Sequence, residues 1–360
     1  MDRRSFLKNS ALGGTAAAAS TLAAPVYAQG KRTLTLVTSW GRGLAGVFDA
    51  AQRAADNINA ITDGTLTIDV KAAGELVGAF EVFDAVTAGQ ADMYHAADYY
   101  FVNQHPGFAF FTAVPFGMTA TELNNWYYHG NGMAMHDKLG EIFGLKSFLA
   151  GNTGTQAGGW FLNEVKGPED FNGLAFRMPG LGGKALGYMG ASVQNIPGAE
   201  VYQALASGAI KGTEWIGPWA DEKAGFQEIT KFYYTAGFHE PAAGLSLATN
   251  REVFESLTPS QQSAIEISAG HANVWNLSQF LMNNGAALER LKAGGVNVLE
   301  FPDSVWDAMG AASQKVYDEF MGDELFKEIY DDYVVSMKAS SGWLSQSIGA
   351  YRQQRDRVLG

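Results

Sequence analysis

The sequence predicts an α/β protein built from two lobes. From Thr33 onwards, short apolar runs alternate with helical segments, which is the pattern of α/β domains. A chain of 360 residues with 47% hydrophobic content is long enough to bury two cores. No low-complexity linker divides the chain, so we expect strands that cross between the lobes instead of a flexible tether.

The first half of the chain is predicted to form strands and helices in turn. An apolar run favours a strand at 33–38, and amphipathic spacing favours a helix at 46–61. The other expected strands are 66–72, 91–95 and 145–149, and the other expected helices are 79–88 and 119–139. The aromatic segment 106–117 contains Val114-Pro115-Phe116, which we expect to cross between the lobes.

The second half repeats the alternation and ends in helices. We expect strands at 173–178 and 296–299 and helices at 180–190 and 199–207. Thr258-Pro259-Ser260-Gln261 forms a capping box with proline at the first helical position, so a long helix should begin there. It should continue to Lys292, where Gly294-Gly295 ends it. Nearly everything from Ser304 to the C-terminus is predicted to be helical.

Residues 1–28 have the features of an export signal, with a charged start, an Ala-rich stretch and a small-residue cleavage site at Val26-Tyr27-Ala28. The run Arg3-Arg4-Ser5-Phe6-Leu7-Lys8 resembles a twin-arginine signal, whose pathway exports folded proteins. An ordinary secretory signal that carries two arginines is the alternative. Both predict a working protein outside the cytoplasm.

Composition narrows the range of partners. Without residues 1–28, 22 Lys and Arg face 36 Asp and Glu, which gives a formal charge of −14. That balance disfavours nucleic acid and anionic membrane surfaces as partners. We expect no membrane insertion, because no later segment has about 18 uninterrupted apolar residues. The absence of cysteine removes a lipid-anchoring thiol and favours a soluble periplasmic protein over a surface lipoprotein.

One internal similarity points to a shared cleft. Residues 85–96 and 204–215 each consist of a helix end, a glycine stop and a short strand, with His95 and Glu214 at matching places. Ligands of open α/β sheets lie outside the carboxyl ends of strands, so both side chains could face one cleft. The alternative is that the helix-Gly-strand pattern recurs throughout α/β proteins.

The sequence disfavours an enzyme. It contains no cysteine nucleophile, no Gly-x-Ser-x-Gly elbow, no His-Glu-x-x-His motif and no phosphate loop, and its six histidines lack metal-ligand spacing. An exported enzyme that uses Glu214 as general base, His95 as acid and a cation as Lewis acid remains the hypothesis from another class.

Three polar residues in glycine-rich surroundings are candidate ligand-binding groups. Arg177 alternates with apolar neighbours just before a Pro-Gly stop, and a guanidinium at such a strand end can grip a carboxylate through two parallel hydrogen bonds. The alternative is a surface ion pair. Gln156 and Glu214 offer hard oxygen ligands, which suit Na⁺ or Ca²⁺, although each can equally be a satisfied polar group.

Three segments and the helices after them resemble a known family. The segments are Gly-Asn-Thr-Gly-Thr-Gln (151–156), Phe-Asn-Gly-Leu-Ala-Phe-Arg-Met-Pro-Gly (171–180) and Ala-Leu-Ala-Ser-Gly-Ala-Ile-Lys-Gly-Thr-Glu-Trp (204–215), and long helices follow them. Along essentially the whole exported chain, the sequence resembles the DctP-type solute-binding proteins of TRAP transporters, and within them the 2-oxo acid receptors.

The resemblance implies a clamshell of two α/β lobes that closes on an organic acid and then docks on a membrane permease. It implies that Arg177 pairs with the acid's carboxylate, and that Gln156, Glu214 and the Trp215 carbonyl hold a cation that also touches the acid, with Glu240 within reach of the metal. The residues implied to contact the acid are Arg177, Gln156, His95, Ala96, Ala97, Tyr99, Tyr100 and Trp215.

Boundaries and assembly also follow from this comparison. We expect a first lobe at 29–150, a second lobe at 151–250, a long helix and return strand across the hinge at 251–303, and C-terminal helices at 304–360. In such receptors the last helix can be exchanged between protomers, so a homodimer is an open expectation. Part of the C-terminal region is expected to return to the first lobe.

The expected ligand is a small 2-oxo or 2-hydroxy monocarboxylate, such as pyruvate or lactate, bound together with Na⁺ or, alternatively, Ca²⁺. With Na⁺, the charges of Glu214, Arg177, the cation and a monocarboxylate sum to zero, whereas Ca²⁺ leaves a positive charge that a dicarboxylate could answer. A C4 dicarboxylate or an amino acid therefore remains the alternative ligand.

Overall fold

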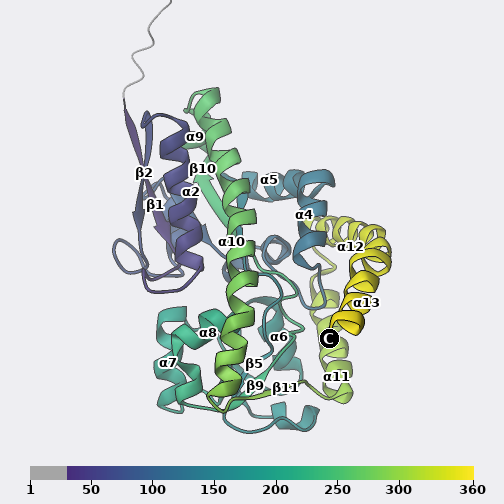
Figure 1. Cartoon of the computed structure of the whole chain (residues 1–360). Helices are drawn as coiled ribbons and strands as arrows, with labels where there is room; N and C mark the ends of the chain where they lie inside the picture. Colours follow the sequence, from purple (N-terminus) through teal and green to yellow (C-terminus); the bar gives the residue numbers. More distant parts are fainter. Residues whose placement is uncertain (1–30) are drawn as a thin grey trace, which may run out of the picture.

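The computed structural model describes residues 31–360, and these form two lobes, each around its own β-sheet (Figure 1). The predicted α/β class with two lobes and a helical C-terminal region is confirmed. The predicted export signal at 1–28 lies outside the described residues. None of the helices in residues 31–360 combines the length and the apolar content that crossing a membrane requires.

The first sheet has five strands in the order β2-β1-β3-β10-β4. Strand β1 pairs in parallel with β2 and β3, while β10 runs antiparallel to both β3 and β4. The strands are β1 (Arg32–Thr38), β2 (Leu66–Lys71), β3 (Met93–Ala96), β4 (Leu145–Asn152) and β10 (Gly244–Asn250). Helices α2 (Val47–Ile61) and α3 (Val82–Thr87) belong to this lobe.

The second sheet has six short strands in the order β11-β9-β5-β8-β6-β7. They are β5 (Gly159–Phe161), β6 (Ala175–Arg177), β7 (Ser192–Gln194), β8 (Gly212–Thr213), β9 (Phe232–Tyr234) and β11 (Asn297–Leu299). Helices α6 (Gly180–Tyr188), α7 (Gly198–Ala206) and α8 (Pro218–Ala224) surround this sheet (Figure 1). The parallel register of β6 and β8 sets Arg177 opposite Thr213, one residue before Glu214.

Strand β10 corrects the expected boundaries, which assigned 151–250 to the second lobe. It lies inside the first sheet, between β3 and β4. Its first six residues are all buried, so it is a central strand whose short apolar run has no partner nearby in the sequence. The chain therefore returns to the first lobe at Gly244, well before the C-terminal helices.

Two segments that cross between the sheets are hydrogen-bonded to each other, as the absence of a linker predicted. The backbone amide of Thr153 donates to the backbone carbonyl of Ala243 (3.1 Å), and the backbone amide of Gln156 donates to the backbone carbonyl of Glu240 (2.9 Å). The Gly237 amide in turn donates to the Gln156 carbonyl (2.9 Å). Gln156 and Glu240 therefore lie on adjacent crossing segments.

Helix α10 (Pro259–Ala293) runs along both lobes (Figure 1). It begins as predicted, with the Thr258 hydroxyl accepting from the Gln261 amide in a capping box. In the first lobe, Asn276 donates to the Gly46 carbonyl (2.9 Å). In the second lobe, Asn284 accepts from the Trp219 amide (3.1 Å). One continuous helix is therefore anchored in both lobes.

The C-terminal region consists of α11 (Asp303–Phe320), α12 (Glu324–Leu344) and α13 (Ala350–Leu359). Helix α11 packs on α6 of the second lobe, whereas α12 packs on α4 (Ala120–His129) of the first. The single helix predicted at 119–139 is in fact two, α4 and α5 (Gly132–Ile142). Helix α4 ends at Gly130, whose ψ of −149° is not helical and which has a low helix propensity.

Candidate functional site

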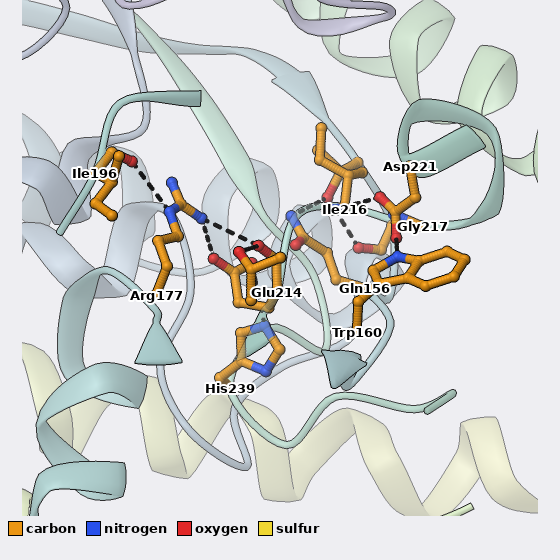
Figure 2. Close-up of polar contacts among 12 residues, drawn as sticks. Gln156, Trp160, Arg177, Ile196, Glu214, Ile216, Gly217, Asp221 and His239 are labelled. Carbon is orange, nitrogen blue, oxygen red and sulfur yellow. Dashed lines mark hydrogen bonds and ion pairs between the residues drawn. The ribbon is translucent and has the colours of Figure 1, made fainter. Parts of the chain in front are cut away.

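Arg177 is the last residue of β6 and is buried between the lobes at 1% exposure. Its Nε donates to the Ile196 carbonyl (3.1 Å), and its Nη1 forms an ion pair with Glu214 Oε1 (Figure 2). Its Nη2 has no hydrogen-bond partner among residues 31–360. The strand end therefore presents a guanidinium that is held at two of its nitrogens and has a third available.

Glu214 follows β8 directly and is completely buried. A buried carboxylate is costly unless it is paired, and Arg177 supplies that pairing. Burial by itself would lower the pKa of Arg177, but the neighbouring acidic groups, Glu214 first among them, together outweigh it, so the pKa of Arg177 is raised and the guanidinium stays charged. The two residues thus neutralise each other inside the protein.

Among the buried side-chain oxygens of residues 31–360 that lack a hydrogen-bond partner, three belong to predicted cation ligands: Gln156 Oε1, Glu214 Oε2 and Glu240 Oε2. The Gln156 amide nitrogen donates to Thr153 Oγ1 (3.0 Å), which fixes its oxygen as the free atom. Burial, followed by the charge of Glu214, raises the pKa of Glu240 well above its usual range. Such unpaired hard oxygens fit a cation such as Na⁺ or Ca²⁺.

His239 stands beside these oxygens, although sequence reasoning assigned it no role. Donor atoms of Glu214, His239 and Glu240 all lie within 4.8 Å of one another, and all three residues are buried. His239 precedes Glu240 in the second crossing segment, and that adjacency was the only signal in the sequence.

Trp215 is positioned by an aspartate that sequence reasoning also missed. Asp221 Oδ1 accepts from the amides of Ile216 (3.0 Å) and Gly217 (2.9 Å), and its Oδ2 accepts from Trp160 Nε1 (2.9 Å) (Figure 2). Burial raises the pKa of Asp221 to about 7. This clamp fixes the turn directly after Trp215.

The Trp215 ring completes the wall near the arginine. The Arg177 guanidinium carbon is 5.4 Å from its centroid, within cation–π range. On the other side, a Cβ added to Gly198 would lie only 2.2 Å from the Trp215 ring. The glycine therefore allows the ring to pack against the first turn of α7.

A small cavity of about 10 Å³, room for roughly one water molecule, lies between the lobes. Five of the predicted residues line it, with Ala97, Tyr99 and Tyr100 from the first lobe facing Gln156 and Trp215. The wall of the cavity does not include Arg177, Glu214 or Glu240. It does include Trp215, and the Arg177 guanidinium lies over the Trp215 ring. Five of the eight residues predicted to contact the acid therefore surround this cavity, and the charged side chains lie outside its wall.

His95 and Ala96 differ from the other predicted residues. Both are fully buried in β3 and do not line the cavity. His95 Nδ1 accepts from Trp40 Nε1 (2.8 Å), and its Nε2 lies 3.2 Å from the Ala150 carbonyl oxygen. Burial lowers the pKa of His95 to about 4, so the imidazole is neutral at pH 7. Trp40 does line the cavity, so His95 is connected to the cavity through its hydrogen bond with the Trp40 ring.

Tyr99 and Tyr100 lie in a short 3₁₀ helix, Asp98–Phe101, that a buried polar network anchors. Asp98 Oδ2 accepts from Ser246 Oγ (2.6 Å) and lies 2.9 Å from His136 Nε2. Burial raises the pKa of Tyr100 to about 12 and that of Tyr99 well above its usual range. Both tyrosines therefore keep their hydroxyl protons as donors.

Comparison with known proteins identifies the family. The model of the DctP family, described as bacterial extracellular solute-binding protein, family 7, matches residues 44–323. The chain belongs to the DctP family. A monocarboxylate 2-oxoacid-binding periplasmic protein from Nostoc sp. is 37% identical over 309 residues, which cover 86% of this chain and 85% of that protein.

Two crystal structures of DctP-type receptors are closely similar. A TRAP transporter solute-binding protein from Bordetella bronchiseptica, a dimer with calcium and picolinate in its occupied site, shares 31% identity with a TM-score of 0.90, over 92% of this chain and 98% of that one. A TRAP periplasmic solute-binding protein from Pseudoalteromonas atlantica, with bound sodium and pyruvate, shares 35% identity with a TM-score of 0.87, over 90% and 99%. The predicted resemblance is confirmed, and the DctP family is one of solute-binding proteins.

Proposed function

We propose that this DctP protein is a periplasmic receptor of a TRAP transporter that captures a small 2-oxo or 2-hydroxy monocarboxylate, such as pyruvate or lactate, together with Na⁺ or Ca²⁺. In this proposal Arg177 pairs with the carboxylate. Gln156, Glu214, Glu240 and the Trp215 carbonyl hold the cation. Ala97, Tyr99 and Tyr100 contact the acid from the first lobe.

The observation that carries the proposal is the buried Arg177–Glu214 pair beside a small cavity between the lobes. Arg177 Nη2 is a free donor for a carboxylate, and the unpaired oxygens of Gln156, Glu214 and Glu240 are free donors of lone pairs to a cation. A bound carboxylate would accept from the free Arg177 nitrogen, and a cation beside it would be coordinated by the unpaired oxygens.

The relatives support the ligand class. Pyruvate and picolinate, which are bound in the two similar crystal structures, both carry a carboxylate next to a second donor atom. Such a pair of donors can close a five-membered chelate ring on one cation, and a simple monocarboxylate without the second donor cannot form that ring. The same chelating geometry is available to a 2-oxo or 2-hydroxy acid in this chain.

A C4 dicarboxylate or an amino acid is the weaker alternative. A second carboxylate would need a second cationic partner, and the described residues that line the cavity include no arginine or lysine. Tyr99, Tyr100 and Trp215 instead provide aromatic walls that suit a small, half-apolar acid.

An exported enzyme that uses Glu214 and His95 gains little support. His95 is hydrogen-bonded to Trp40 and lies 3.2 Å from the Ala150 carbonyl oxygen, and its pKa of about 4 leaves it without the positive charge of a strong acid at pH 7. Incubation of the protein with each acid, followed by NMR, should detect no product.

Calorimetric titration tests the proposal directly. Pyruvate, lactate, succinate and alanine are each titrated with Na⁺, with Ca²⁺ and without either cation. We expect pyruvate or lactate to bind more tightly when a cation is present. Failure of every acid to bind in all three conditions would reject the proposed function.

Export and delivery are part of the same proposal. Residues 1–28 would direct the chain to the periplasm, by the twin-arginine route if Arg3 and Arg4 are read by that pathway. The loaded receptor would then dock on the TRAP permease subunits. Replacing both arginines by lysine should abolish export if the twin-arginine route is used, and fractionation of cells measures this.

We also propose that the receptor is a homodimer formed through its C-terminal helices. Large apolar side chains are exposed along this region, including Trp343 at 71% and Leu359 at 80%. A contiguous exposed apolar surface is typical of an interface, and the Bordetella relative is a dimer. Sedimentation velocity of the exported chain, compared with a chain that ends at Leu344, measures the mass.

A further inference from the structure

His239 is buried at 2% exposure beside the two carboxylates of the candidate cation site, yet nothing satisfies its polar atoms. Neither ring nitrogen has a hydrogen-bond partner within residues 31–360. Buried polar groups in proteins are nearly always hydrogen-bonded or bound to an ion, so an unpaired buried imidazole suggests a missing partner. A missing partner would lie next to one of the ring nitrogens.

The imidazole is held in a fixed orientation by two glycines. A Cβ added to Gly237 would lie 2.5 Å from His239 Cε1, and one added to Gly182 would lie 2.5 Å from His239 Cβ. Such contacts leave no room for a larger side chain at either position. In this orientation Nε2 faces Glu214, as Figure 2 shows.

The spacing between His239 and Glu214 fits two donors that share an ion. His239 Nε2 is 3.5 Å from Glu214 Oε2, which is longer than an ordinary N–H···O hydrogen bond. Two donors that are each about 2.1 Å from a tetrahedral ion are separated by about 3.4 Å. Glu240 supplies a third donor atom within 4.8 Å of both.

We propose that His239 is a nitrogen ligand of the cation site, so that the site takes a divalent transition-metal ion, such as Zn²⁺ or Co²⁺, in addition to the hard cation of the proposed function. Na⁺ and Ca²⁺ select oxygen donors, whereas imidazole nitrogen suits Zn²⁺ and related ions. Two carboxylates and one imidazole form a ligand set that is common for such metals.

The charges of the site are compatible with a divalent ion once Glu240 is counted. A divalent ion that binds the Glu240 carboxylate displaces its proton. Glu214, Glu240 and a bound monocarboxylate then contribute three negative charges, and Arg177 contributes one positive charge. A divalent ion brings the sum to zero. The receptor would then capture the acid as its metal chelate.

Metal titration without any acid tests this inference apart from the proposed function, on which it rests. Zn²⁺ and Ca²⁺ are titrated by calorimetry into the chelator-treated wild-type protein and into His239→Gln, which removes the imidazole. We expect His239→Gln to weaken Zn²⁺ binding by at least about tenfold and to change Ca²⁺ binding by less than about threefold. The exposed His129→Gln serves as the matched control and should change neither.

Co²⁺ provides a second readout on the wild-type protein, which needs no variant to fold. Its visible absorption should report a nitrogen ligand and should change in His239→Gln but not in His129→Gln. Equal losses of Zn²⁺ and Ca²⁺ binding in His239→Gln, or wild-type Zn²⁺ binding with an all-oxygen Co²⁺ spectrum, would overturn the inference. Failure of the wild-type protein to bind Zn²⁺ would do so too, whether or not it binds pyruvate with Na⁺ or Ca²⁺.

Discussion

Arg177 and Glu214 form an ion pair in which both side chains are almost completely buried, at 1% and 0% exposure. The pair joins the end of β6 to the residue after β8, and it lies between two lobes that the chain crosses more than once. An acid that binds both Nη atoms of Arg177 must displace Glu214 from Nη1, and a cation that binds both oxygens of Glu214 must displace Arg177 from Oε1. Acid and cation should therefore bind cooperatively.

The first prediction concerns Arg177→Lys. Lysine keeps the charge but loses the planar fork and the Nε donor that reaches the Ile196 carbonyl. Affinity for pyruvate should fall by at least about tenfold, which is about 1.4 kcal/mol. Calorimetry measures this, and Arg42→Lys, in an exposed ion pair with Glu75, is the control. Unchanged affinity in Arg177→Lys would move the carboxylate site elsewhere.

The second prediction concerns the stability of the pair itself. Removing either charge alone, by Arg177→Met or Glu214→Gln, should reduce the free energy of unfolding by about 3 kcal/mol, because a buried charge is left without its partner. The double variant should lose less than the sum of the two single losses. Chemical denaturation of the four proteins gives the coupling, and strict additivity would show that the pair contributes nothing.

The structure shows which parts of this molecule local sequence determines. The start of α10 was predictable because Thr258, Pro259 and Gln261 specify a helix start by themselves. Strand β10 was not, because its neighbours β3 and β4 are distant in the chain and only tertiary packing selects it.

In the candidate site, too, the sequence predicted some features and missed others. Arg177 and Glu214 were predicted separately, but their direct pairing depends on the register between β6 and β8, which no local pattern encodes. Asp221 in α8 contacts the turn that precedes its helix, and His239 comes close to Glu214 only in the folded chain, so their residue types alone did not predict these positions. His95 was predicted to face the cleft, and its ring is instead occupied by Trp40 and lies against the Ala150 carbonyl.

The third prediction uses the pKa of His95, which burial lowers from 6.5 to about 4. The unfolded chain binds a proton at His95 below a pH of about 6.5, whereas the folded chain does not until a pH of about 4. The contribution of neutral His95 to the free energy of unfolding is therefore complete above pH 6.5. It is lost as the pH falls toward 4, by about 3 kcal/mol in total. Unfolding of wild-type and His95→Gln at pH 7 and 4.5 isolates this contribution, since His95→Gln should lose less stability on acidification. Equal losses in both proteins would contradict the assignment.

The fourth prediction concerns the clamp at Asp221. In Asp221→Asn the amide group would face donors from Trp160, Ile216 or Gly217, so at least one buried hydrogen bond is lost. At pH 8 the free energy of unfolding should fall by about 2 kcal/mol. Affinity for the cation should also fall, because the turn after Trp215 is released. The exposed Asp318→Asn should do neither, and unchanged cation affinity in Asp221→Asn would show that the clamp has no effect on the site.

The last prediction concerns the small residue behind the aromatic wall. A methyl group at Gly198 would approach the Trp215 ring to 2.2 Å, so Gly198→Ala must displace that ring from the cavity and from the Arg177 guanidinium. Pyruvate affinity should fall by about tenfold, which corresponds to about 1.4 kcal/mol. Gly187→Ala in helix α6 is the matched control, because a Cβ there meets nothing within 4 Å. Tryptophan fluorescence should shift in Gly198→Ala and not in Gly187→Ala. If the fluorescence shifts and affinity does not, the Trp215 ring is not part of the acid site.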